Sequence, residues 1–139
     1  MNNIVGFYQQ PRHMEGPRAT MVDVVPGAIL FIVGVSFDRL QPTRISTVEV
    51  RSLPKLFNND RWYAHHVGVR RDGKRNKVVT DMSLRDAGII PNTYNLCRTF
   101  TNREDAEIYK ARMDNHQLTH FEQRTFEQIM RKRMQQYGY

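Results

Sequence analysis

The order of hydrophobic and polar positions predicts strands in the first two thirds of the chain and helices in the last third. Residues 28–37 are apolar at both odd and even positions, which is typical of a strand covered on both faces. Residues 44–51 are half apolar and half polar and predict a second strand. Ile45 is out of step with Val48 and Val50, so a β-bulge is expected in this strand.

Three more strands follow, each bounded by turn-forming residues. They are expected at residues 61–70, 77–80 and 94–100. Between the last two, Ser83 can cap and Gly88 can end a one-turn helix over residues 84–87. Because the connections between strands are short, the sheet should be mostly antiparallel.

Two capping boxes predict helices in the last third of the chain. Thr101–Glu104 and Thr119–Glu122 each place a hydroxyl three residues before a carboxylate, so that the two side chains can satisfy the first free N–H groups of a helix. The inner face of the first helix is expected to carry Ala106, Tyr109 and Met113. The apolar stripe of the second helix comprises Phe126, Ile129, Met130, Met134 and Tyr137. This stripe should pack on the sheet or on a second copy of the chain.

Several short strands followed by helices indicate an α+β fold. We expect a small twisted antiparallel sheet or an SH3-like five-stranded barrel, with two C-terminal helices. The length of 139 residues suits one domain, residues 1–139. Within it we distinguish an N-terminal arm (1–24), a β-rich core (25–100) and a helical C-terminal part (101–139).

The distribution of charge adds a functional indication to this fold. The chain has 21 basic and 14 acidic residues, for a formal net charge of +7. Residues 61–100 alone carry eight basic and three acidic residues, whereas the segments on either side are close to balance. A local cationic field of this kind favours phosphate backbones or acidic protein surfaces as partners.

The basic excess is centred on a predicted hairpin over residues 67–79. Asp72-Gly73 is a strong signal for a two-residue type I′ turn, which needs positive φ at both central positions. Five cations flank this turn: Arg70, Arg71, Lys74, Arg75 and Lys77. Like charges that face each other across a hairpin repel, so this tip invites an anionic partner. The alternative is a solvated hairpin whose charges only protect a sheet edge from wrong pairing.

Two further groups of residues could contact nucleic acid. Arg61 and Trp62 place a cation beside an aromatic ring that could stack on bases, although such a ring is more often part of the core. Arg131 and Lys132 belong to a cationic cluster near the C-terminus that could clamp a second phosphate. Complementing the dipole of the last helix is their structural alternative.

Catalytic and metal-binding patterns are weak. Adjacent residues of a strand point to opposite faces, so His65 and His66 cannot act as a pair. His116 and His120 have the spacing of helical zinc ligands, but Thr119 is expected to cap a helix between them. The single Cys97 allows no disulfide within the chain. We therefore expect no metal, no cofactor and no enzymatic activity.

The layout of the chain resembles a known group of small barrels. A Pro26-Gly27 turn precedes an apolar strand, a polar strand follows, and a long basic hairpin comes next. This order over residues 25–110 is similar to small KOW/SH3-like barrels, which include phage DNA-binding or transcription-modifying proteins of the MotB type. Residues 99–109, which end a sheet and start a helix, also resemble small phage proteins. The resemblance implies a non-enzymatic nucleic-acid binder.

The function expected from these features is nucleic-acid binding through the basic hairpin, with DNA a better candidate than RNA. The alternative is a phage-type protein that binds and modulates an acidic host protein. A third alternative is a structural or assembly subunit that forms a homodimer through the last helix. The longest apolar run, residues 28–35, is far shorter than the roughly 20 residues that span a bilayer, so we expect no membrane contact and a cytoplasmic location, in the host if the chain is viral.

Overall fold

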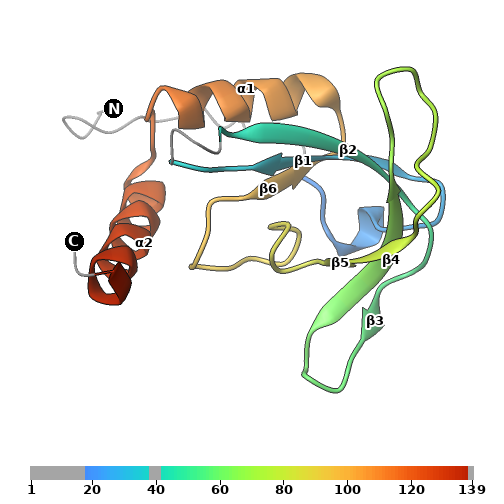
Figure 1. Ribbon diagram of the computed structural model, residues 1–139, viewed down its shortest axis with the longest axis horizontal. Coiled ribbons are helices and arrows are strands. Elements are labelled where there is room, and N and C mark those ends of the chain that lie inside the picture. The colour runs from blue at the N-terminus through green and yellow to red at the C-terminus, as the bar shows by residue number, and fades with distance from the viewer. Residues whose placement is uncertain (1–17, 38–41, 138–139) are drawn as a thin grey trace.

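The computed structural model describes residues 18–37 and 42–137, so most of the expected N-terminal arm lies outside the described residues. Within these residues, six strands, two α-helices and a short 3₁₀ helix follow one another (Figure 1). They are η2 (Met21–Asp23), β1 (Ile29–Gly34), β2 (Arg44–Val50), β3 (Lys55–Leu56), β4 (Trp62–Gly68), β5 (Thr80–Ser83), β6 (Arg98–Phe100), α1 (Arg103–Asp114) and α2 (His120–Tyr137). This order confirms the α+β class with two C-terminal helices.

The strands form one open antiparallel sheet with the order β3-β4-β2-β1-β6, and β5 also pairs with β4. His66 of β4 pairs with Val50 on one side and with Thr80 on the other, so β5 takes the edge of β4 opposite to β2. Tyr63 in the same way separates β3 from β5, which places β2 and β3 along one edge of β4. No pairing among the described strands joins β6 to β4 or β5, so the sheet does not close into the SH3-like barrel that was one expectation.

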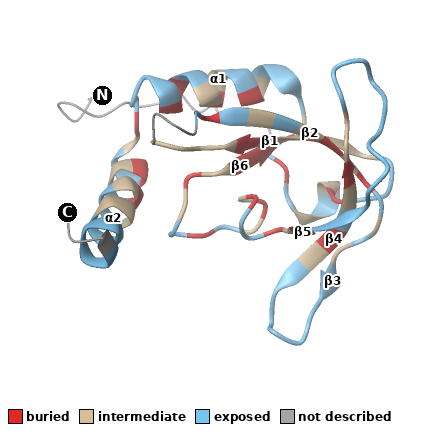
Figure 2. Cartoon of the chain, in the orientation of Figure 1, coloured by how far each residue is buried: buried red, intermediate tan, exposed pale blue. Residues whose placement is uncertain are grey.

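The sheet is covered on both faces, as the apolar run of β1 predicts. Leu30 belongs to a cluster with Val48 and Val50 that lies under η2 and the loop after β5. Val33 belongs to a second cluster under α1, which also contains Phe100. In Figure 1, α1 lies along one side of the sheet and η2 with the loop after β5 on the other. The buried residues of Figure 2 concentrate between these layers.

The expected bulge at Ile45 is wrong. The pairing of β1 with β2 runs without interruption from Ile29↔Glu49 to Gly34↔Arg44. Ile45 packs with the cluster under α1, whereas Val48 packs with the cluster on the opposite face. Apolar residues of both parities therefore indicate two covered faces here, not an irregular strand.

Two strands begin later than expected. Residues 77–79 do not pair, and the fourth expected strand begins at Thr80; the fifth is limited to β6. The expected one-turn helix at 84–87 is a turn. Gly88 has φ +75°, and a Cβ there would lie 2.1 Å from the Cys97 carbonyl oxygen, so glycine is required. Leu84 and Ile89, beside this turn, are buried in the core without pairing as a strand.

Both helix starts carry side-chain caps. The cap of α1 lies one residue later than expected, because Asn102 Oδ1 accepts the Asp105 N–H at 2.9 Å. The capping box of α2 is confirmed: Glu122 Oε1 accepts the Thr119 N–H at 2.8 Å, and Thr119 Oγ1 accepts the Glu122 N–H at 3.2 Å. The expected inner face of α1 is confirmed, because Ala106, Tyr109 and Met113 are all buried.

A buried ion pair joins the two helices. Arg112 donates two hydrogen bonds to the carboxylate of Glu122, at 2.8 and 3.0 Å. Burial alone would raise the pKa of Glu122, but hydrogen bonds from Arg112 and Thr119 and the charges of Arg112 and Arg18 outweigh it and lower the pKa. This bidentate pair fixes the orientation of the start of α2 relative to the end of α1.

Candidate nucleic-acid interface

The basic hairpin ends in a three-residue loop and not in the expected two-residue type I′ turn. Arg70 N–H donates to the Lys74 carbonyl at 2.8 Å, and Gly73 N–H donates to the Arg70 carbonyl at 2.9 Å. Gly73 has φ +84°, but Asp72 is not among the residues with positive φ. This is the pattern of a type I turn followed by a left-handed glycine. The carboxylate of Asp72 accepts the Lys74 N–H at 2.9 Å and holds the loop in this form.

The hairpin separates from the sheet just beyond β4. Val69 N–H donates to the Thr47 carbonyl at 2.9 Å, and the pairing of β2 with the chain after β4 ends there. Within the hairpin, His66 pairs with Thr80 and Val69 pairs with Arg75. The two pairs are three residues apart on the first arm but five residues apart on the second. The two extra residues let the arm bend away, so the edge of β2 at residues 44–46 faces a groove.

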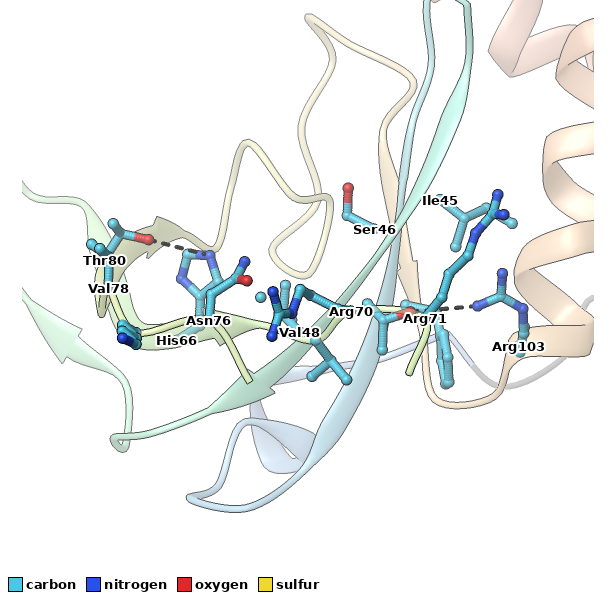
Figure 3. Close-up of a pocket in the computed structure, with 15 residues that line it drawn as sticks. Ile45, Ser46, Val48, His66, Arg70, Arg71, Asn76, Val78, Thr80 and Arg103 are labelled. Atoms are coloured by element: carbon cyan, nitrogen blue, oxygen red, sulfur yellow. Dashed lines mark hydrogen bonds between the residues drawn. The ribbon is translucent and has the colours of Figure 1, made fainter. Parts of the chain in front are cut away.

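This groove has a volume of about 1340 Å³ and is lined by 15 residues (Figure 3). They come from β1, β2, β4, the hairpin, β5 and the first residue of α1. Four are cations: Arg70, Arg71, Lys77 and Arg103. None of the 15 is acidic. We call this site the basic groove.

The cations of the basic groove reach it from different directions. Arg70 is the last residue of one hairpin arm and Arg71 is the first residue of the loop, and their side chains point in different directions (Figure 3). In Figure 3, Arg70 extends toward His66 and Asn76, and Arg71 extends toward Ile45 and Arg103. Positive charge is therefore present along the length of the groove.

Arg103 is held at the α1 end of the groove. Its Nη1 donates to Thr47 Oγ1 at 3.4 Å, and its Cζ lies 6.0 Å from the centroid of the Phe31 ring. Its ion pair with Glu107 is 3.8 Å long and exposed, so it neutralises little of the charge. The pair of Arg70 with Asp72, at 4.0 Å, is equally exposed.

Only some of the cations expected at the hairpin line the groove. Arg70, Arg71 and Lys77 do, whereas Lys74 and Arg75 do not. Arg75 Nη2 donates to Glu49 Oε2 at 3.3 Å, and this hydrogen bond is the largest cause that lowers the pKa of Glu49. Arg75 is thus partly neutralised by a carboxylate of β2.

The other expected contact residues lie elsewhere. Arg61 directly precedes β4 and Trp62 begins it, in the hairpin with β3 that points away from the basic hairpin (Figure 1). The side chain of Trp62 is 36% exposed, so it is not simply core. Arg131 and Lys132 are exposed on α2, at the opposite end of the molecule from both hairpins (Figure 1). The structure does not bring these four residues together with the groove.

Two residues of the groove were not expected from the sequence. Arg103 was assigned only to a helix start, and 56 residues separate it from Thr47. His66 Nε2 lies 3.5 Å from Thr80 Oγ1, while its Nδ1 is buried without a hydrogen-bond partner in the described part of the chain. Burial is the main cause that lowers the pKa of His66, which is therefore neutral near pH 7. The local sequence carries no signal for either position, because both depend on packing between remote segments.

The other histidines in the described part of the chain are not grouped with two further metal ligands. His65 lies on the face opposite to His66, as expected, and its Nδ1 is 2.7 Å from Asp81 Oδ1. His116 has φ +53° and precedes α2, so it does not share a helix turn with His120. Within residues 18–37 and 42–137, no three His, Cys, Asp or Glu residues are grouped so that they could hold a metal ion.

The fold and the groove define a class: an α+β protein whose open antiparallel sheet carries, at one strand edge, a recessed site in which every charged side chain is a cation. Comparison with protein families gives the particular assignment. Residues 18–113 match the phage g100-like protein family, and the chain belongs to that family. The phage part of the resemblance is confirmed, but this match does not support the KOW/SH3-like type.

Two other comparisons add nothing to this assignment. No curated protein matches the chain, and no solved structure does. Among the described residues, no helix has the length and apolar character needed to cross a bilayer.

Proposed function

We propose that this protein is a non-enzymatic nucleic-acid-binding protein of a phage, which holds a sugar-phosphate backbone in the basic groove. One observation carries the proposal: 15 residues line the groove, four of them are cations and none is acidic. A recessed site of one sign concentrates counter-ions, and phosphate contacts gain further free energy from the release of condensed cations. DNA is the first candidate and RNA the second.

The size of the groove supports a polymer over a small anion. Pockets for small molecules enclose roughly 300–1,000 Å³. The basic groove encloses about 1340 Å³ and has cations at both ends. A chain of several phosphates would satisfy these charges together, whereas a single phosphate would leave most of them unpaired.

A salt titration tests this proposal. Arg71→Ala with Lys77→Ala removes two groove cations, and Arg131→Ala with Lys132→Ala removes the same charge from α2. Each phosphate contact contributes about −0.7 to −0.9 to the slope of log K against log salt. We expect the groove variant to weaken binding to DNA and RNA of any sequence and to flatten the slope by about 1.4–1.8. The α2 variant should change neither the binding affinity nor the salt slope.

Two outcomes would contradict the proposal. One is an equal loss in both double variants, which would mean that binding follows net charge and not the groove. The other is a wild-type protein that shows no salt-dependent binding. Melting curves of both variants verify that the fold is retained, since all four side chains lie outside the buried core.

A second candidate function is binding to an acidic host protein, and the β3–β4 hairpin favours it. This hairpin exposes four apolar side chains, at fractions between 36% and 59%: Leu53, Leu56, Phe57 and Trp62. Lys55 and Arg61 flank them and are also exposed. An exposed apolar cluster with a charged rim is typical of a protein-binding surface. A pull-down with and without nuclease separates the two candidates, because only a protein partner survives the nuclease.

A further inference from the structure

We infer that the basic groove takes single-stranded nucleic acid and not a duplex. This inference rests on the proposed function and adds the form of the nucleic acid to it. The arrangement of the cations, the chemistry of the groove wall and the path of the groove support it independently.

Three of the five hairpin cations line the groove, and Lys74 and Arg75 lie outside it. Arg70, Arg71 and Lys77 line the groove, and Arg103 closes its α1 end. Of the hairpin cations outside it, Arg75 is paired with Glu49 at 3.3 Å. A hairpin that entered the major groove of a duplex would need its charges on the outer surface.

The two walls of the groove also favour a flexible chain over a stiff rod. The groove runs between the edge of β2 and a hairpin that rises beside the start of α1 (Figure 1). Duplex DNA is stiff over a persistence length of about 150 base pairs, so bending it into a recess between these walls would cost free energy. A single strand is flexible enough to follow it, with its phosphates on the four cations.

The groove also offers partners for unpaired bases. The Phe31 ring lines it, and the Arg103 guanidinium lies over this ring with Cζ 6.0 Å from the centroid. Aromatic rings and guanidinium planes are the surfaces on which unpaired bases stack. Further along, the lining includes hydroxyl and amide groups that can bond base edges, on Ser46, Asn76 and Thr80. A base stacked inside a duplex has no free face for such a ring or guanidinium plane.

A direct comparison of substrates tests the inference. Labelled oligonucleotides of about 12 nucleotides, within the range of known single-strand sites, are titrated as single strands and as duplexes of the same sequence. We expect the single strand to bind at least about tenfold more tightly than the duplex. Equal or tighter duplex binding would overturn the inference and leave the proposed function standing. Binding to neither form would overturn both.

A pair of core variants locates the bases. Phe31→Leu removes the stacking surface, and Phe100→Leu changes its cross-strand neighbour, which is buried and does not line the groove. We expect Phe31→Leu to lower single-strand affinity several-fold to about a hundredfold, the range set by loss of one stacked base. Duplex binding should not change. Phe100→Leu should lower the melting temperature at least as much but leave single-strand affinity unchanged. Equal affinity losses in the two variants would contradict stacking on Phe31.

Discussion

Adjacent side chains of one strand meet very different surroundings in this protein. His65 is exposed and faces Asp81, whereas His66 points into the basic groove wall with one ring nitrogen buried and unpartnered among the described residues. The same contrast separates Arg75, which a carboxylate partly neutralises, from Arg71, which lines a groove without acidic side chains. Alternation along a strand predicts that such neighbours differ, but not which one meets a groove.

The buried position of His66 predicts a pH-dependent stability. Burial lowers its pKa below the ordinary value of 6.5, so below that pH the unfolded chain binds more protons at this position than the folded protein does. Its contribution should therefore reduce stability as the pH falls from about 7 through 6.5 toward the lower folded pKa. The free energy of unfolding, measured with denaturant, should fall less between pH 7 and pH 5.5 in His66→Gln than in the wild type. All other groups are the same in the two proteins and cancel in the difference; equal losses would mean that His66 is solvated.

At the scale of elements, β4 connects two hairpins that share one turn geometry. Phe57 N–H donates to the Arg61 carbonyl and Asp60 N–H to the Phe57 carbonyl, which repeats the pattern at Arg70–Lys74. The left-handed position is Gly73 in the basic hairpin and Asp60, with φ +61°, in the apolar one. The sequence predicts both turns from their Asn, Asp and Gly residues, but it does not predict that both are three-residue loops.

Substitutions at these equivalent positions should have opposite effects on stability. Gly73→Ala forces a Cβ into the left-handed region and should cost about 1–2 kcal/mol of unfolding free energy. Asp60→Gly relieves the same strain, and the flexibility it adds to the unfolded chain offsets part of the gain, so it should stabilise by less than about 1 kcal/mol. Chemical denaturation measures both. Changes of the same sign would show that the two loops are not equivalent.

The whole molecule presents three separate surfaces: the basic groove, the apolar β3–β4 hairpin and the far end of α2 (Figure 1). The start of α2 is anchored, because the Phe126 ring lies 4.6 Å from that of Phe37 and 4.7 Å from that of His116. The stripe beyond it is less buried in the single chain: Ile129 and Met130 are half-buried, and Met134 is 56% exposed. The side chain of Tyr137 lies outside the described residues.

We propose that this stripe pairs two copies of the chain through α2. Met134→Glu would place a charge in the paired surface and should shift the protein from dimer to monomer in sedimentation or light-scattering measurements. Gln135→Glu adds the same charge at the next exposed position of α2 and should leave the dimer intact. A wild-type protein that stays monomeric at high concentration would contradict this pairing and leave the end of α2 as a solvated helix.

Local patterns determined much of this protein before folding. The apolar run of β1, the α1 face of Ala106, Tyr109 and Met113, and the Thr119–Glu122 cap are each set by neighbours within a few residues. The concentration of charge in residues 61–100 is likewise a property of the chain alone. These features need no knowledge of remote contacts, because periodicity reports the environment of each position within its own helix or strand.

Only the tertiary structure decided how these parts meet. Whether the sheet closes depends on pairing between its outer strands, and a local pattern says nothing about that. The same holds for the basic groove. Arg103 donates a hydrogen bond to Thr47, 56 residues away in the sequence, and Arg75 donates one to Glu49, 26 residues away. Side chains acquire such partners when remote segments pack against each other, and that packing distinguishes the four groove cations from the other positive charges of the chain.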